Sequence, residues 1–151
     1  MNITTEQIKE LRDATGVSVM QCKKALEEAS GDMEKAKIIL RKISKQSADK
    51  KAGRSLGAGT VASYIHSNGT VGAMVELLCE TDFVARNEDF KTLARDITMH
   101  ITAMDPENLE ELLNQEFIKS PDKTIKNLIE EAIQKFGEKT EIGRFVRFSI
   151  K

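Results

Sequence analysis

The first 45 residues carry apolar positions at helical spacing, separated by polar and glycine-containing breaks. Thr4 and Gln7 have the spacing of a capping box, which predicts that a first helix begins there. A second helix is expected from about Ser18, and Asp32 is suited to cap a third. The pattern therefore predicts a small three-helix bundle in residues 1–45, which would be marginally stable alone.

The start of the second predicted helix holds two apolar residues that point in different directions. Val19 belongs to the core stripe of this helix, together with Cys22. Met20 is rotated by about 100° from that stripe and has no obvious place in the same core. Met20 either folds under its neighbours or, beside Lys23, belongs to an exposed apolar loop that docks on a partner. The pattern alone leaves both interpretations open.

Residues 46–59 lack a sustained apolar period, and we expect a basic, flexible linker there. Lys50, Lys51 and Arg54 could attract RNA phosphates. No aromatic residue is interleaved to stack on bases, however, so a solvated tether is the favoured interpretation.

Residues 60–66 and 71–79 read as two strands joined by Asn68-Gly69, a strong signal for an antiparallel hairpin. If those two residues make the turn, Tyr64 faces Ala73. Both prolines suggest starts of helices, because proline at the first helical position costs no hydrogen bond. These start signals are Asp105-Pro106 and Ser120-Pro121, and a longer helix is expected after Asn87.

A third strand is expected over residues 141–150, where apolar and polar positions alternate and Arg144 is a polar interruption on the apolar face. Such a sheet needs its apolar face covered, and the predicted helices can cover it. The fold class is therefore α+β, with a three-stranded antiparallel sheet covered by helices in a core domain of residues 60–151. The apolar positions of the third strand are Ile142, Val146, Phe148 and Ile150.

Charge divides the chain in the same way as the apolar pattern does. Residues 1–54 hold twelve Lys and Arg against eight Asp and Glu, whereas residues 55–151 hold eleven against sixteen. This asymmetry suggests two modules with different surfaces. No stretch approaches the roughly 20 apolar residues of a membrane helix, and the first residues lack the layout of a signal peptide. We expect a cytoplasmic protein or a mature organellar one, without membrane contact.

Candidate chemistry for catalysis is sparse. Cys22 and Cys79 lack zinc-ligand spacing and are expected to be small core residues, and His66 near the hairpin tip is expected on the surface. No nucleophile–base spacing or phosphate-binding glycine loop accompanies them. We therefore expect no catalytic residue, metal site or cofactor, and an enzyme is disfavoured.

The segment Glu80 to Asn87 links the second strand to the long helix, and a polar turn is expected there. Instead, Phe83 and Val84 stand beside Asp82, and Thr81 or Asp82 could cap a helical turn. Phe83 either plugs the junction between sheet and helix or, with Asp82, forms a hot spot presented to a partner.

Three motifs, in order along the chain, resemble those of the elongation factor Ts family. The first comprises Leu11-Arg12-x-x-Thr15-Gly16, Met20-x-Cys22-Lys23-Lys24-Ala25-Leu26 and Gly31-Asp32. The second is Cys79-Glu80-Thr81-Asp82-Phe83-Val84-Ala85, and the third is Arg144-Phe145-x-Arg147-Phe148. The N-terminal layout is also similar to a ubiquitin-associated-type bundle.

This resemblance implies a guanine-nucleotide exchange factor of translation elongation that performs no covalent chemistry. It would bind elongation factor Tu in its GDP form and promote GDP release by disturbing the magnesium and phosphate site. The nucleotide-free complex would then be resolved by GTP. The implied wedge consists of Thr81, Asp82, Phe83, Val84 and Ala85. The implied docking residues on the GTPase domain are Arg12, Val19, Met20, Lys23 and Lys51.

The chain departs from the family pattern in two ways. Val19-Met20-Gln21-Cys22 replaces the usual pair of methionines followed by Asp-Cys, although valine keeps the apolar character. Longer members carry a second core subdomain and a coiled coil for which this chain is too short. A homodimer could replace the missing contacts. The remaining alternative is a ubiquitin-like binding scaffold or an RNA-binding accessory of translation, although direct nucleic-acid binding is not expected.

Overall fold

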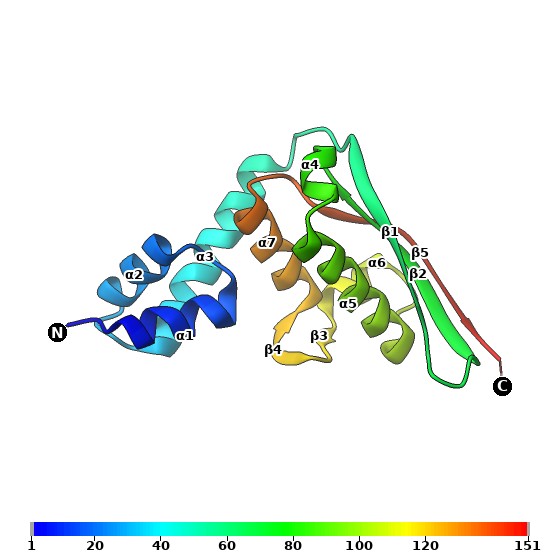
Figure 1. The fold of residues 1–151 in the computed structure, drawn as a ribbon, viewed down its shortest axis with the longest axis horizontal. Coiled ribbons are helices and arrows are strands. Elements are labelled where there is room, and N and C mark those ends of the chain that lie inside the picture. Colours follow the sequence, from blue (N-terminus) through cyan, green and yellow to red (C-terminus); the bar gives the residue numbers. More distant parts are fainter. Residues whose placement is uncertain (1, 151) are drawn as a thin grey trace.

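The computed structural model describes residues 2–150 and has an α+β fold, as predicted (Figure 1). Three helices form an N-terminal bundle, and a three-stranded sheet with four helices and a small hairpin forms the rest. The bundle consists of α1 (Thr5–Thr15), α2 (Val19–Glu28) and α3 (Met33–Lys51). The remaining elements are β1 (Ala58–Ile65), β2 (Val71–Cys79), α4 (Asp82–Ala85), α5 (Glu88–Met104), α6 (Leu109–Asn114), β3 (Glu116–Phe117), β4 (Ser120–Thr124), α7 (Ile125–Phe136) and β5 (Glu141–Ser149).

The three bundle helices begin where capping chemistry predicted. Thr4 and Gln7 form the capping box of α1, and the side chains of Ser18 and Asp32 cap α2 and α3. Gly16 ends α1 with a φ of 71°, a left-handed conformation that glycine adopts without a steric penalty. Leu11, Cys22, Leu26 and Leu40 lie among the fully buried residues of the bundle core. The predicted three-helix arrangement is confirmed.

Helix α3 extends into residues 46–59, the segment that was predicted to be a flexible linker. α3 continues as a helix to Lys51, and β1 already begins at Ala58. The helix continues because its later turns pack against the core domain: Ser44 is buried and donates a hydrogen bond to Gln134 of α7, and Ala48 packs against the main core. Tertiary contacts thus stabilise a segment whose local sequence is polar. The division into two folding units remains a prediction.

The sheet has the order β1-β2-β5, with both neighbouring pairs antiparallel. Tyr64 faces Ala73, as the hairpin pattern predicted. The predicted helix start at Ser120-Pro121 is wrong, because these residues open β4, which pairs with β3. α7 begins at Ile125 instead, where Thr124 and Asn127 form a capping box that precedes the apolar stripe.

β5 changes its facing direction at a β-bulge. Its pairing with β2 shifts between Val75 and Leu77. Before the shift, Ile142 faces the core, and after it the residue that faces the core is Phe145. Val146 and Phe148 therefore lie on the open face of the sheet, and the expectation that helices cover them is wrong. One extra residue in a strand reverses which side chains face the core.

The bulge is stabilised by an ion pair on the open face. The guanidinium of Arg144 forms two hydrogen bonds with the carboxylate of Glu76, at 3.0 and 2.9 Å. The backbone N–H of Arg144 donates a further one, at 2.8 Å. These hydrogen bonds lower the pKa of Glu76 to about 2. Arg144, the polar residue among the predicted apolar positions of this strand, is thus the partner of a carboxylate on the neighbouring strand.

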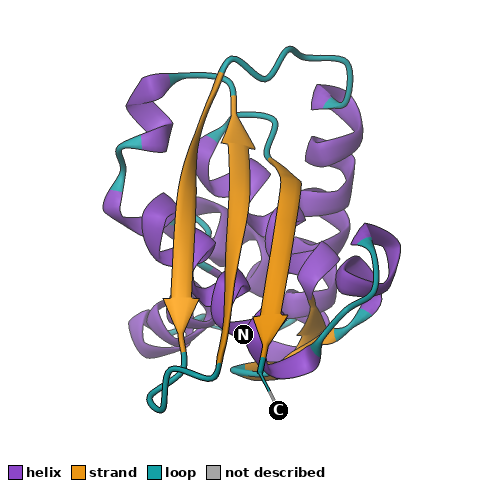
Figure 2. Ribbon diagram, turned by 90° about the vertical axis from the view of Figure 1, so that its right-hand side faces the viewer, coloured by secondary structure: helices purple, strands orange, loops and turns teal. Residues whose placement is uncertain are grey.

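Over residues 2–150, all helices of the core domain lie on one side of the sheet and leave its other side bare (Figure 2). The main core forms between the sheet and these helices, around Leu77, Phe90, Ile97 and Ile125. Cys22 and Cys79 are both buried free thiols, as expected for core residues. Among residues 2–150, no helix has the length and apolar character needed to cross a membrane.

Polar contacts hold the bundle against the core domain. Lys123 Nζ donates to the backbone carbonyl of Ala14 at 2.9 Å and to the carboxylate of Glu131 at 3.0 Å. The side chains of Lys123 and Glu131 are mostly buried. Burial raises the pKa of Glu131, and Lys123 opposes that effect. Gln134 of α7 also donates to Gln21 of α2, so the junction involves two bundle helices besides α3.

Candidate functional site

The corner between β2 and α5 presents an exposed phenylalanine on a single helical turn. Thr81 caps α4 by accepting a hydrogen bond from the backbone N–H of Val84. Phe83 is 86% exposed, and Asp82 is exposed beside it. Val84 and Ala85 are buried in the main core and anchor the turn from its other side. Phe83 therefore does not plug the junction; Val84 and Ala85 fill it.

A carboxylate from a distant loop holds this corner from behind. Glu138 lies between α7 and β5, and its Oε1 accepts the backbone N–H groups of Glu80 (3.1 Å) and Thr81 (3.0 Å). Its Oε2 accepts the hydroxyl of Thr81 at 2.6 Å. In return, the carboxylate of Glu80 accepts the backbone N–H of Lys139 at 2.6 Å. Sequence reasoning missed Glu138, because no local pattern links residues so far apart.

The second group of predicted contact residues lies on the first turns of α2. Met20 is 69% exposed and Val19 is 49% exposed, so neither residue belongs to the bundle core. The expected place of Val19 in the core stripe is wrong, because Cys22, Ala25 and Leu26 form that stripe. Of the two interpretations of Met20, the structure supports the exposed one.

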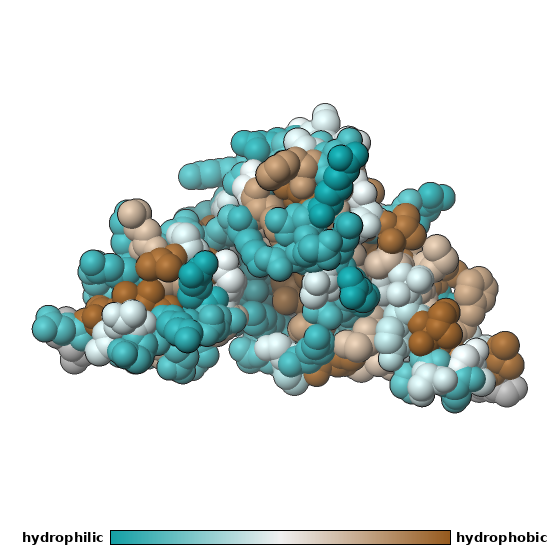
Figure 3. All heavy atoms as spheres, in the orientation of Figure 1, coloured by the Kyte–Doolittle hydropathy of each residue, from teal (hydrophilic) through white to brown (hydrophobic). Residues whose placement is uncertain are grey.

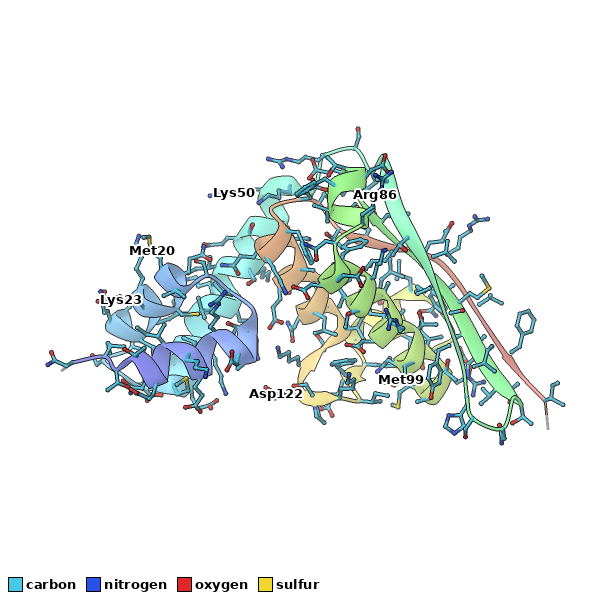
Figure 4. The ribbon with its side chains drawn as sticks, in the orientation of Figure 1. Met20, Lys23, Lys50, Arg86, Met99 and Asp122 are labelled. Carbon is cyan, nitrogen blue, oxygen red and sulfur yellow. The ribbon has the colours of Figure 1, made fainter. Side chains whose placement is uncertain are left out.

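The other predicted docking residues are more scattered. Lys23 is exposed on α2 and lies 4.0 Å from the carboxylate of Glu27, and Arg12 is exposed in the last turn of α1. Lys51 ends α3 and donates to the hydroxyl of Ser47 at 2.9 Å. In Figure 4, Met20 and Lys23 lie on the bundle, whereas Lys50 and Arg86 lie near the top of the molecule, at the end of α3 and at α4.

Apolar surface is visible at both places. In Figure 3, brown and tan atoms appear over the bundle and again just below the apex, in the region of α4, with hydrophilic surface between them. Exposed apolar side chains framed by polar surface are characteristic of protein interaction sites. The arrangement can contact a partner at two separated points.

Groups that could perform covalent chemistry are not assembled at this corner. Burial raises the pKa of the Cys79 thiol, which opposes formation of a nucleophilic thiolate. His66 lies near the hairpin, 3.2 Å from the Tyr64 hydroxyl, and His100 is buried, with its ring nitrogens facing Gln115 and the N–H of Ile118. Over the described residues 2–150, His, Cys, Asp and Glu side chains form no cluster that could hold a metal ion.

Comparison with known proteins identifies the family. A family model described as elongation factor TS matches residues 80–151, which begin at the α4 corner. Elongation factor Ts of Carboxydothermus hydrogenoformans is 42% identical, over 98% of this chain and 89% of the relative. The alignment spans 193 positions, more than the 151 residues of this chain, so the relative has residues that this chain lacks.

A second relative gives the same result. Elongation factor Ts of Trichlorobacter lovleyi is 47% identical over 99% of this chain, which spans 48% of that longer protein. Identity at this level over almost the whole chain includes both the bundle and the corner that carries Phe83. The chain belongs to the elongation factor Ts family.

Proposed function

We propose that this protein is a guanine-nucleotide exchange factor of translation elongation, which binds elongation factor Tu in its GDP form and accelerates GDP release. The observation that carries the proposal is the α4 corner, where Phe83 is 86% exposed on a turn anchored by two buried neighbours. Phe83 is not covered within the chain itself, so a partner protein would have to bury it. Family membership supports elongation factor Tu as that partner.

The proposed mechanism is thermodynamic coupling without covalent chemistry. If the factor binds the nucleotide-free GTPase more tightly than the GDP-bound form, it must weaken GDP binding by the same factor. Phe83 would supply apolar insertion, and the Asp82 carboxylate would compete for positions near the magnesium ligands and the phosphate-binding loop. GTP would then fill the empty site and release the factor.

Docking on the GTPase domain would use the bundle. The exposed side chains of Val19 and Met20 would supply an apolar contact, and Lys23, Arg12 and Lys51 would form its polar rim. Because α3 is continuous and packs on α7, the distance between this surface and the corner is held by the fold. Two contacts at a set separation would add specificity to the wedge.

Release of a fluorescent GDP analogue from elongation factor Tu tests this proposal. Adding the chain should accelerate release in proportion to its concentration, by at least an order of magnitude, and excess GTP should reverse complex formation. An unchanged release rate would contradict the proposed function. Steeply salt-dependent binding to RNA in the same preparation would instead favour the alternative of an RNA-binding accessory.

We further infer that two copies of the chain associate through the bare face of the sheet. This face carries apolar side chains that the helices leave open. A two-fold axis would place this apolar face of one copy against the same face of the other copy. A second copy suits the face because antiparallel sheets pack face to face over such residues. The exposed apolar residues of the face are Val61, Ile65, Met74, Val146, Phe148 and Ile150.

The variant Phe148→Asp tests this association. It places a charge on the proposed interface, and the sedimentation behaviour should change from a dimer to a monomer at micromolar concentration. Ile38→Asp, at a similarly exposed position on α3, should leave the dimer intact. A wild-type chain that sediments as a monomer at these concentrations would contradict the association.

A further inference from the structure

We propose that Glu138 is a positioning residue for nucleotide exchange, which acts by fixing the turn that carries Asp82 and Phe83. The inference rests on the proposed exchange function, and Glu138 lies outside the motif of residues 79–85 that carries the wedge. Glu138 is 57 residues from Thr81 in the chain and reaches it with both carboxylate oxygens. Its contacts are with the backbone and the cap of the corner, and Phe83 itself stays free.

The corner needs an external support because it is too short to hold itself. α4 has four residues, and an isolated helix of one turn is not stable in water. The last residue of β2 that pairs with β5 is Leu78, so the N–H groups of Glu80 and Thr81 have left that ladder. Glu138 accepts both N–H groups with one charged oxygen, and hydrogen bonds to a charged acceptor are stronger than neutral ones.

The second oxygen of Glu138 determines the orientation of the helix cap. A threonine hydroxyl has one proton to donate and lone pairs that can accept. The hydroxyl of Thr81 donates a hydrogen bond to Glu138 Oε2 at 2.6 Å, and the hydroxyl oxygen of Thr81 accepts one from the backbone N–H of Val84 at 3.4 Å. Because Glu138 accepts the hydrogen bond from the hydroxyl of Thr81, the lone pairs of that hydroxyl oxygen are oriented toward the first turn of α4. The position of Phe83, two residues after Thr81, follows from that cap.

The end of β2 and the loop that carries Glu138 hold each other through hydrogen bonds in both directions. Glu80 accepts the backbone N–H of Lys139 at 2.6 Å, so the strand end holds the loop while the loop holds the strand end. Arg54 approaches the Glu80 carboxylate at 3.4 Å. A wedge held in its bound geometry before contact loses less conformational entropy on binding. Loss of Glu138 should therefore weaken exchange although every residue of the wedge remains.

Two variants at this position distinguish positioning from simple structural support. Glu138→Ala removes all three hydrogen bonds and should reduce the acceleration of GDP release about tenfold. Glu138→Gln keeps one carbonyl oxygen for the N–H groups but replaces the acceptor of the Thr81 hydroxyl by an amide donor, so it should restore part of the activity. Glu141 is a nearby exposed residue whose carboxylate pairs with Lys139, and the control variant Glu141→Ala should act like the wild type.

A double-mutant cycle with Phe83→Ala tests the route of the effect. If Glu138 acts through the corner, Glu138→Ala should cause little further loss once Phe83 is absent. Equal losses in both backgrounds, or no loss in the single variant, would overturn the proposal. Amide hydrogen exchange at Glu80 and Thr81 gives a readout that does not depend on elongation factor Tu, and it should accelerate in Glu138→Ala. Protected amides in that variant would refute the support itself, whereas an inactive wild type with protected amides would refute only the exchange function.

Discussion

Replacing Phe83 by alanine should slow GDP release from elongation factor Tu by about 30-fold or more while leaving the fold intact. A truncated hot-spot residue costs about 2 kcal/mol or more at an interface, and about 1.4 kcal/mol corresponds to a tenfold change in rate. The side chain is 86% exposed in the free protein, so its removal creates no cavity. The loss should therefore appear in exchange kinetics and not in the unfolding curve.

Two control variants make the result specific. Ile38→Ala removes an exposed apolar side chain from α3 and should leave both exchange and stability unchanged. Phe90→Ala removes a fully buried ring that packs edge-to-face on Phe136, and it should destabilise the fold by about 3–5 kcal/mol. If Phe83→Ala instead unfolds the protein, or if it exchanges nucleotide at the wild-type rate, the wedge assignment is wrong.

Replacing Lys123 by methionine should destabilise the folded protein by about 2–4 kcal/mol at neutral pH, because it removes the ion-pair partner of the mostly buried Glu131. The substitution also removes the hydrogen bond from Lys123 to the Ala14 carbonyl, which links the core domain to the bundle. Chemical denaturation at pH 7 measures the change. Glu131→Gln in the same background removes the unpaired charge and should recover most of the lost stability.

The cost of Lys123→Met should depend on pH with a definite sign. Burial already raises the pKa of Glu131 above its ordinary value of 4.5, and loss of the lysine raises the pKa further. The folded variant then binds a proton more tightly than the unfolded chain does, so its stability increases as the pH falls through the raised pKa. The difference from the wild type should shrink between neutral pH and about pH 4.5. A constant difference over this range would show that the charge of Glu131 is not responsible.

Local chemistry was sufficient to predict the elements whose ends are set by capping and turn residues. Thr4, Ser18 and Asp32 cap the bundle helices where they were expected, and Asn68-Gly69 closes the β1–β2 hairpin in the predicted register. These features depend on hydrogen bonds between residues that are at most a few positions apart. The prediction for Ser120-Pro121 was wrong because it considered only neighbouring residues: the pair resembles a helix start, but pairing with β3 places it in a strand.

By itself, the sequence determined the α+β class, the order of the main elements and the family motif at the β2–α4 corner. Only the tertiary structure decided which side chains of those elements are free. In the structure, Val84 and Ala85 are buried, whereas Phe83 is exposed to solvent. Val19 lies outside the bundle core, and the bulge at Arg144 places Phe148 on the exposed face of the sheet. It also brought Glu138 to the corner. These outcomes depend on contacts between residues distant in the chain, whereas capping and turn formation depend on neighbours.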